Sequence, residues 1–157
     1  MKDKQFIIKY VNEEDEPLLK NMYLKDIEED PKKASRFAQD LIYKFKTLAC
    51  LSEERIIGTI SWEPKGGLED GVIELIALGT TPSYQRRGVG SELINTLINE
   101  AKAFFAQLSY KLRVIYLFME KNNEIGRKFY KRKGFREIFT IPSFLPHDDA
   151  VFWIKYF

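Results

Sequence analysis

Two glycines set one residue apart, with two arginines before them, mark the segment of this sequence best suited to binding an anion. The segment reads Gln85-Arg86-Arg87-Gly88-Val89-Gly90-Ser91, and a long stretch of helical apolar spacing follows it. A helix that begins here offers unpaired backbone N–H groups and the positive end of its dipole. Because glycine has no side chain, the backbone can approach a ligand closely and several N–H groups can converge on phosphate oxygens.

Two other kinds of phosphate-binding loop are excluded by the residues present. A Walker loop needs Gly-x-x-x-x-Gly-Lys-Ser/Thr, a pattern that this segment lacks. A dinucleotide-binding fold needs a third glycine at position 93, where the sequence has Leu93. Taken alone, the glycine pair is equally compatible with an ordinary turn, so its meaning depends on the rest of the chain.

A second segment combines a helix-capping residue, an aromatic pair and a glycine stop. It reads Asn123-Glu124-Ile125-Gly126-Arg127-Lys128-Phe129-Tyr130-Lys131-Arg132-Lys133-Gly134-Phe135. This segment resembles the Asn-x-x-Ala-x-x-Phe-Tyr-x-Lys-x-Gly-Phe signature of the GNAT superfamily of N-acetyltransferases. The earlier loop resembles the same family's Arg/Gln-x-x-Gly-x-Gly/Ala pyrophosphate loop. The two motifs occur in the family's order, and the resemblance covers the chain from about Val72 to Ile138.

Three departures from the family's pattern are visible. Gly126 replaces the usual alanine, Arg132 the usual lysine, and Gly79-Thr80 stand where an alanine–valine pair is more usual. The first two are mild, and the third concerns the bulge of the strand before the loop rather than the loop itself.

The resemblance implies that acetyl-CoA is the cosubstrate, and no metal is expected. Pantetheine would enter a gap between two splayed parallel strands, and the pyrophosphate would bind backbone amides of the glycine loop. Asn123 would contact the pantetheine arm, cap its own helix, or do both. Arg127 belongs to a late basic cluster, which taken alone favours a solvated helix face and which the resemblance would instead relate to an anionic cofactor. The expected coenzyme contacts are Leu78, Gly79, Thr80, Gln85, Arg86, Arg87, Gly88, Val89, Gly90, Ser91, Asn123, Arg127 and Tyr130.

Acetyl transfer to an amine requires two proton movements, and two residues are candidates for them. The ammonium must lose a proton before it attacks, and the departing thiolate must gain one or be stabilised. Tyr130 is the candidate acid, because the family's tyrosine commonly points at the coenzyme sulfur; the alternative is a core aromatic residue. Glu74 is the candidate base, since it is the one charge inside an apolar strand, where burial would raise its pKa. A solvent-facing or salt-bridged glutamate is the equally weighted alternative.

Two other reactive side chains are assigned bland roles. His147 is the single histidine and lies in Pro146-His147-Asp148-Asp149, which reads as an exposed turn. Cys50 is the single cysteine and reads as a small core residue on a strand, because no base is placed beside it.

Hydrophobic periodicity predicts the elements that position these residues. The expected strands span residues 6–11, 47–51, 55–62, 72–80, 113–119, 135–141 and 151–157, and the expected helices 18–29, 34–45, 88–108 and 123–132. Pro31 is expected to break the first helix, and a polar turn at 52–54 predicts a hairpin. The strand–helix–strand unit from Val72 to Met119 should form a parallel pair by a right-handed crossover.

The element order predicts a mixed α/β fold, and the resemblance specifies the GNAT acyl-CoA N-acyltransferase fold. That fold has a mostly antiparallel twisted sheet of about seven strands, one splayed parallel pair and about four flanking helices. Residues 1–157 are expected to form a single N-acetyltransferase domain, because no linker or repeat interrupts them.

Composition narrows the partners and the location. With 45% hydrophobic and 31% charged residues, the chain has a globular composition. A net charge of +2 is too balanced to favour nucleic acid, and no apolar run is long enough to span a bilayer. Met1 to Gln5 show no signal region, and the lone cysteine does not suggest secretion, so a cytoplasmic location is expected.

The leading hypothesis is therefore direct acetyl transfer from acetyl-CoA to a primary amine in a ternary complex. The acceptor is left open between a small amine or polyamine and a protein N-terminus or lysine. A catalytically weak acyl-CoA sensor or interaction module is the alternative. A homodimer is possible, with the aromatic tail as its contact: Phe152, Trp153, Tyr156 and Phe157.

Overall fold

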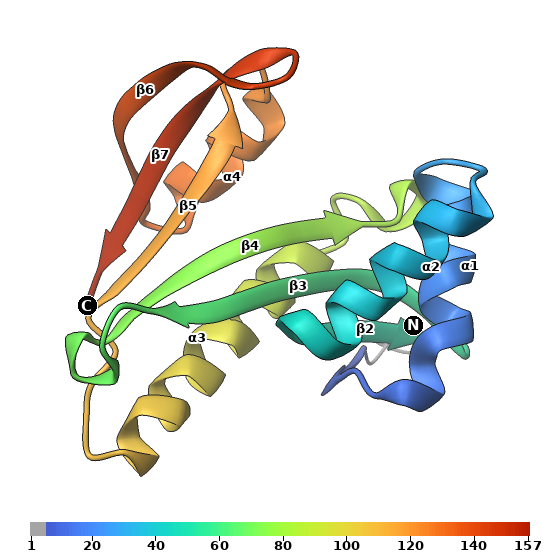
Figure 1. The fold of residues 1–157 in the computed structure, drawn as a ribbon, viewed down its shortest axis with the longest axis horizontal. Helices are drawn as coiled ribbons and strands as arrows, with labels where there is room; N and C mark the ends of the chain where they lie inside the picture. Colours follow the sequence, from blue (N-terminus) through green and yellow to red (C-terminus); the bar gives the residue numbers. More distant parts are fainter. Residues whose placement is uncertain (1–5) are drawn as a thin grey trace. The chain divides into compact units, whose positions relative to one another are not determined.

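The computed structural model describes residues 6–157, so the segment Met1–Gln5 lies outside the described residues. Seven strands form one sheet in the order β1-β2-β3-β4-β5-β7-β6, in which β4 and β5 are parallel (Figure 1). Four α-helices accompany the strands in this part of the chain. The predicted mixed α/β fold, with its mostly antiparallel sheet and one parallel pair, is confirmed.

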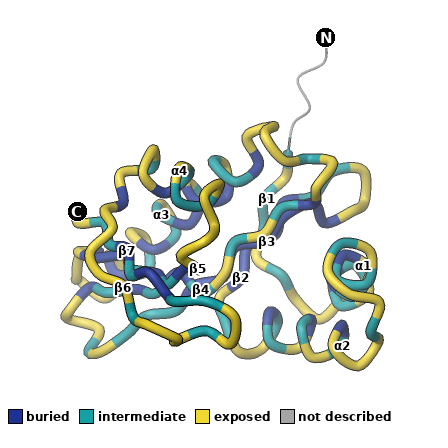
Figure 2. Tube along the Cα trace, turned by 90° about the horizontal axis from the view of Figure 1, so that it is seen from above, coloured by how far each residue is buried: buried dark blue, intermediate teal, exposed yellow. Residues whose placement is uncertain are grey.

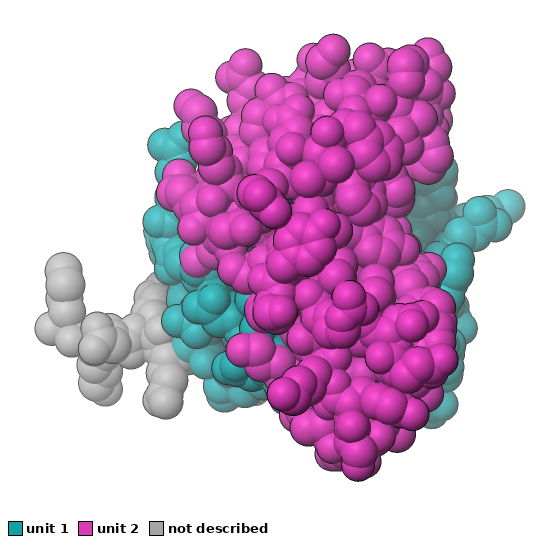
Figure 3. Space-filling model, turned by 90° about the vertical axis from the view of Figure 1, so that its left-hand side faces the viewer, with its two compact units in different colours: residues 1–63, 77–100 teal, residues 64–76, 101–157 magenta. Residues whose placement is uncertain are grey.

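The chain divides into two compact units, shown in different colours in Figure 3. Unit 1 comprises residues 1–63 and 77–100, and unit 2 comprises residues 64–76 and 101–157. Strands β3 and β4 and helix α3 each continue from one unit into the other. The expectation of a single domain over residues 1–157 stays a prediction.

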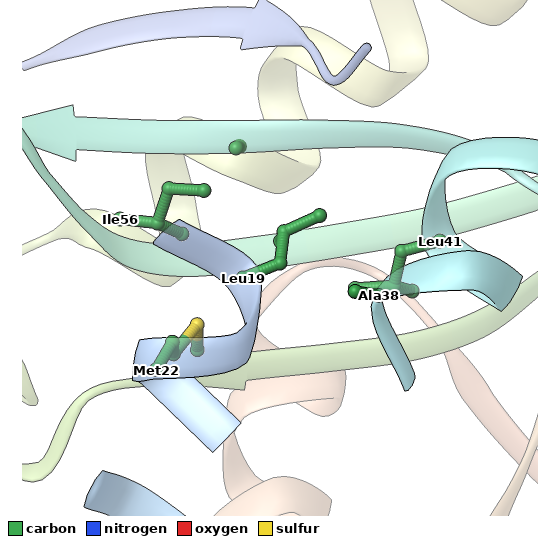
Figure 4. Packing of buried hydrophobic residues seen from close by; sticks show 6 residues of the cluster. Leu19, Met22, Ala38, Leu41 and Ile56 are labelled. Atoms are coloured by element: carbon green, nitrogen blue, oxygen red, sulfur yellow. The ribbon is translucent and has the colours of Figure 1, made fainter. Parts of the chain in front are cut away.

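Unit 1 contains strands β1 (Ile7–Tyr10) and β2 (Lys46–Ser52), most of β3 (Arg55–Lys65), and helices α1 (Glu16–Asp26) and α2 (Pro31–Gln39). Strands β2 and β3 carry long buried runs (Figure 2). The helices pack on them through Leu19, Met22, Ala38 and Leu41, which surround Ile56 (Figure 4). These apolar residues recur at helical spacing, so the predicted helices follow from their buried stripes.

Two boundaries around Pro31 differ from the prediction. Helix α1 ends at Asp26 rather than near Glu29, and Pro31 is the first residue of α2. Asp30 is the N-cap, and its carboxylate accepts hydrogen bonds from the amides of Lys32 and Lys33 at 3.0 and 3.2 Å. Proline suits the first helical position because its missing N–H is not needed there. The second predicted helix is completed by a π-helical turn over Asp40–Lys44.

The β2–β3 hairpin is confirmed, and it contains a bulge that matters for the site. Ser52 pairs with Arg55 across the turn, where Glu53 and Glu54 have φ values of 50° and 61°. Cys50 pairs with Gly58 but Leu51 pairs with Ile56, so Ile57 is the extra residue of the bulge.

Helix α3 (Val89–Gln107) confirms the predicted apolar stripe. Its buried residues include Val89, Leu93, Ile94, Leu97, Ala101 and Phe105. None of the helices in the described part of the chain has the length and apolar character that a membrane crossing requires.

Unit 2 is built on strands β5 (Val114–Glu120), β6 (Arg136–Leu145) and β7 (Asp148–Tyr156), with helix α4 (Glu124–Arg132). The parallel ladder joins Val72–Glu74 of strand β4 (Val72–Thr80) to Val114–Tyr116 of β5. Within unit 2 the ladder ends at Glu74 and Tyr116, although both strands continue. Backbone groups beyond that point are therefore not used in this ladder.

The aromatic tail divides between the core and the surface. Trp153 is buried, whereas Tyr156 and Phe157 are exposed. Trp153 therefore completes the core rather than offering a dimer contact, and the proposed homodimer stays a prediction.

Burial raises the pKa of the Cys50 thiol in unit 1 to about 11, with a smaller contribution from the Glu92 carboxylate. The side chain is fully buried in β2, as the sequence interpretation of a core residue requires. A free thiol in the unfolded chain titrates near pH 8.5. The unfolded state therefore loses its proton first, and the folded state is stabilised less as the pH rises from about 8.5 towards 11.

We therefore expect the free energy of unfolding to fall by roughly 2 kcal/mol between about pH 8 and about pH 10, apart from other titrations. In Cys50→Ala this part of the fall should be missing. Urea unfolding at a series of pH values, with both proteins side by side, measures the difference. Identical pH profiles would show that Cys50 does not couple ionisation to folding.

Candidate functional site

The start of the glycine loop is fixed by a buried threonine in unit 1. The Thr81 backbone N–H donates to the carbonyl of Ile57, the bulge residue, at 2.8 Å. Its hydroxyl donates to Asp26 Oδ2 at the end of α1, at 2.9 Å. Thr81 is thus held to β3 and to α1 at once, and the chain leaves β4 at a defined point.

Gly58 allows the start of α3 to press closely against strand β3. A Cβ atom at this position would lie 2.9 Å from Val89 Cγ1, 3.1 Å from Leu93 Cδ1 and 3.1 Å from the Gly79 carbonyl oxygen. Real Cβ atoms are hardly ever found so near their neighbours, because interiors are already close-packed. The absent side chain therefore sets where the first turn of α3 lies, and with it the amides of that turn.

The loop itself presents an open and positively charged backbone. Gln85 to Gly88 form an exposed turn between a 3-10 turn (Pro82–Tyr84) and α3. Arg86 and Gly88 have φ values of 62° and 84°, and no atom lies within 4 Å of a Cβ built on Gly88. The Gln85 amide donates to the Thr80 carbonyl at 3.4 Å, and the Arg87 guanidinium lies over the Tyr84 ring.

These features make the loop a suitable anion site. The first hydrogen bond of α3 runs from the Glu92 N–H to the Gly88 carbonyl. The N–H groups of Val89, Gly90 and Ser91 precede it and, as in any helix, have no intrahelical acceptor. A phosphate group placed before this helix would meet these amides, the helix dipole and the two arginines. Direct coenzyme contact by these residues, and by Leu78, Gly79 and Thr80, stays a prediction.

In unit 2, Asn123 caps helix α4. Its side-chain oxygen accepts the Gly126 N–H at 2.9 Å, which confirms the capping interpretation. The position of Gly126 is crowded: a Cβ atom on it would lie only 2.7 Å from the side-chain amide nitrogen of Asn123 and 2.8 Å from Met119 Sδ. The departure from the family's alanine thus accompanies a tight packing of α4 on Met119.

Tyr130 lies on the buried side of α4. Its ring makes edge contacts with Phe129 and Phe135, at centroid distances of 5.2 and 5.5 Å. Burial raises the pKa of its hydroxyl well above the ordinary value of a tyrosine. The ring packing fits the core interpretation, and the proton-donor role stays a prediction that the protonated hydroxyl permits.

Arg127 is engaged within unit 2. One guanidinium nitrogen donates to the Lys121 carbonyl at 3.1 Å, and Nε lies 3.7 Å from Glu137 Oε2, beyond hydrogen-bond distance. The side chain lines a cavity of about 460 Å³ together with Lys131, Gly134, Phe135, Arg136, Glu137 and Trp153. Its contact with the coenzyme stays a prediction.

Glu74 stands at the last pair of the parallel ladder and is only partly exposed. Its side chain is 20% exposed, and Oε2 lies 3.2 Å from Lys65 Nζ. The Tyr116 hydroxyl donates to the same oxygen at 3.5 Å. The structure therefore shows a salt-bridged glutamate, which was one of the two interpretations, and the role of base stays a prediction.

His147 is exposed in the two-residue turn between β6 and β7, as predicted. Within residues 6–157, no three histidine, cysteine, aspartate or glutamate side chains come together as metal ligands would.

Sequence reasoning missed four residues that shape the site: Asp26, Gly58, Lys65 and Thr81. A glycine inside an apolar strand is a known signal of close backbone approach, so Gly58 could have been found. Asp26, Lys65 and Thr81 act through side-chain contacts between residues that are far apart in the sequence. No local sequence pattern predicts such pairs.

The sequence matches the model of the Acetyltransferase (GNAT) family over residues 12–135. No curated protein sequence matches the chain.

Several solved structures share the fold. The ribosomal-protein-S18-alanine N-acetyltransferase from Escherichia coli is 17% identical, with a TM-score of 0.77 over 97% of this chain and 94% of that chain. Arabidopsis thaliana NAA60 in complex with acetyl-CoA is 17% identical, with a TM-score of 0.73 over 97% of this chain and 98% of that chain. Ard1 from Thermoplasma volcanium is 14% identical, with a TM-score of 0.76 over 96% of this chain and 97% of that chain.

A side chain at Gly58 should displace the first turn of α3, because a Cβ atom there would lie too close to Val89 and Leu93. We expect Gly58→Ala to lower the free energy of unfolding by about 1–3 kcal/mol, because the new methyl group overlaps Val89 and the Gly79 carbonyl. Gly79→Ala is the matched control, since Gly79 is a strand residue on which a Cβ atom would meet no other atom within 4 Å. Urea unfolding of both variants measures the difference, and equal stabilities would contradict the packing argument.

Proposed function

The chain belongs to the GNAT family of acetyltransferases, and we propose that it transfers an acetyl group from acetyl-CoA to a primary amine. The observation that carries the proposal is the open glycine loop before α3, whose amides and arginines suit a pyrophosphate. In the proposal acetyl-CoA is a cosubstrate that supplies an activated acetyl group as a thioester. The acceptor is a small amine or polyamine, or the amino group of a protein.

The residues of the loop fit such a ligand. Gly88 is exposed, its φ of 84° is one that glycine adopts without strain, and the space beside it is open. In the proposal the amides from Arg86 to Ser91 bind the pyrophosphate oxygens. The side chains of Arg86 and Arg87 neutralise the negative charge at the rim, and backbone groups of Leu78, Gly79 and Thr80 hold the pantetheine arm.

Tyr130 is the proposed partner of the departing thiolate. Because burial raises its pKa, the hydroxyl keeps its proton at neutral pH and can donate a hydrogen bond. A thiol titrates near pH 8.5, well below this tyrosine, so complete proton transfer to the sulfur would be uphill. We therefore assign Tyr130 the stabilisation of the thiolate by hydrogen bonding rather than its full protonation.

Glu74 is the proposed base. A primary ammonium has a pKa near 10 and must lose a proton before its nitrogen can attack the thioester. The carboxylate lies at the end of the parallel ladder, where its Oε2 contacts Lys65 and Tyr116, and in the proposal it accepts the proton through a water molecule. The product amide is uncharged, so its attraction to this carboxylate is lost after transfer.

Direct attack by the amine is favoured over an acyl-enzyme on a cysteine. Cys50 is the single cysteine of the chain, it is fully buried, and its raised pKa keeps it as the unreactive thiol.

The loop assignment predicts a charge-specific loss of affinity. Gly88→Asp should weaken acetyl-CoA binding at least about 100-fold, because a carboxylate facing phosphates costs several kcal/mol. Gly88→Asn is the control, since asparagine has nearly the same shape, tolerates a positive φ and carries no charge. Isothermal titration calorimetry with acetyl-CoA measures both. Equal affinities of the two variants for acetyl-CoA would contradict the assignment of the phosphates to the loop at Gly88.

The mechanism predicts a loss of turnover at Tyr130. Tyr130→Phe should lower kcat by about 10- to 100-fold with acetyl-CoA affinity nearly unchanged, because only the hydroxyl toward the thiolate is lost. Release of the coenzyme thiol with a panel of primary amines measures kcat. An unaltered rate would return Tyr130 to a purely structural role. Saturable coenzyme binding without thiol release for any acceptor would instead favour an acyl-CoA sensor.

A further inference from the structure

A cavity of about 460 Å³ lies within unit 2, between helix α4 and strands β6 and β7. Arg127 and Lys131 line it from α4, where their spacing of one helical turn puts both side chains on one face of the helix. Glu137 and Trp153 line it from the sheet, where they are partners across β6 and β7 and therefore share one face. The remaining lining residues come from the segment where α4 leads into β6: Gly134, Phe135 and Arg136. The cavity therefore needs no residue of unit 1.

The lining combines a buried apolar floor with an excess of positive charge. Phe135 and Trp153 are each 2% exposed, so their rings form the floor. Lys131 and Arg136 are exposed and lie where solvent reaches the cavity. Three of the lining side chains are cations, and Glu137 is the single carboxylate among them. A ligand that suits this lining has an apolar body and an anionic group.

Two buried N–H groups among the lining residues have no acceptor. Within residues 6–157, neither Arg127 Nε nor Trp153 Nε1 has a hydrogen-bond partner. Glu137 Oε2 lies 3.7 Å from Arg127 Nε, which is too far for a hydrogen bond. A buried donor without a partner costs free energy, and native structures rarely contain one. The cavity is therefore suited to an additional anionic oxygen beside Arg127.

We propose that this cavity binds a small organic carboxylate with an aromatic body, as a site separate from those of the coenzyme and the acetyl acceptor. The ligand's carboxylate replaces that of Glu137 beside Arg127 and accepts the hydrogen bond that Nε lacks. Nε is covered in the present arrangement, so the Glu137 side chain, which is 42% exposed, turns towards solvent as the ligand enters. The ligand's ring packs against Phe135 and Trp153.

The lining favours an organic carboxylate over inorganic phosphate. Phosphate has no apolar part, so it would leave the rings of Phe135 and Trp153 without a contact. It also presents more acceptor oxygens than a carboxylate and needs more donors. The Arg127 guanidinium has few to spare, because one of its nitrogens already donates to the Lys121 carbonyl at 3.1 Å.

The test uses 2-naphthoate as the ligand and the tryptophan indole N–H groups as reporters. The chain has two tryptophans, Trp62 in unit 1 and Trp153 in the cavity, and each gives its own NMR signal. We expect 2-naphthoate to shift the Trp153 signal saturably, with a Kd of about 1 mM or below, while the Trp62 signal stays in place. The neutral 2-naphthamide has nearly the same shape and should bind at least about tenfold more weakly, because it lacks the charge.

Substitutions of the charged residues should change the affinity in opposite directions. Glu137→Gln should strengthen 2-naphthoate binding by about two- to fivefold, because the ligand no longer displaces a like charge. Lys131→Gln and Arg136→Gln should each weaken it several-fold. Lys128→Gln is the matched control, since Lys128 is an exposed lysine of the same helix that does not line the cavity, and it should keep the wild-type affinity.

Four results would overturn the inference. These are a Trp153 signal that does not move at about 10 mM 2-naphthoate, equal binding of 2-naphthamide, weaker binding in Glu137→Gln, or the same loss in Lys128→Gln as in Lys131→Gln. Competition by coenzyme A would also overturn it, because the cavity would then belong to the coenzyme. None of these measurements requires turnover, so their outcome is independent of whether the protein transfers acetyl groups.

Discussion

The close contact between Gly58 and the first turn of α3 is the constraint on which the position of the glycine loop depends. A side chain on β3 at this point would overlap Val89, Leu93 and the Gly79 carbonyl. The adjacent bulge at Ile57 presents a carbonyl that holds Thr81, whose hydroxyl in turn binds Asp26. Strand, loop and helix are thus fixed relative to one another within unit 1, and the exposed amides need no reorganisation to receive an anion.

Unit 2 holds Tyr130 and Glu74, the two residues proposed to act on protons. Its helix α4 holds Tyr130 in a packed aromatic environment, where the hydroxyl stays protonated. Its strands place Glu74 at the end of the parallel ladder, beside Tyr116. Side chains alternate along these strands, so Leu117 and Trp153 complete the core while Tyr116 and Phe152 point to the opposite face of the sheet.

Much of the fold could be predicted from the sequence because its signals are local. Apolar spacing revealed α3 and its buried stripe, and Gly134, with a φ of 86°, ends α4 where a glycine stop was expected. Pro31 was assigned to the end of a helix rather than to the start of the next, because proline suits both positions. The Lys65–Glu74 pair and the orientation of Arg127 depend on which side chains the fold brings together. The spacing of residues along the sequence does not predict these tertiary contacts.

The depth at which Cys50 lies also determines what a thiol-reactive dye would count. In the folded protein the single cysteine is inaccessible and protonated, so it consumes no reagent. In a thiol-release assay of the proposed reaction, any colour would then come from freed coenzyme and not from the protein itself. When the protein unfolds, each molecule exposes one thiol, so the same dye then measures the amount of unfolded protein. Because Cys50 is buried, a single reagent can measure both the rate of thiol release and the fraction of unfolded protein.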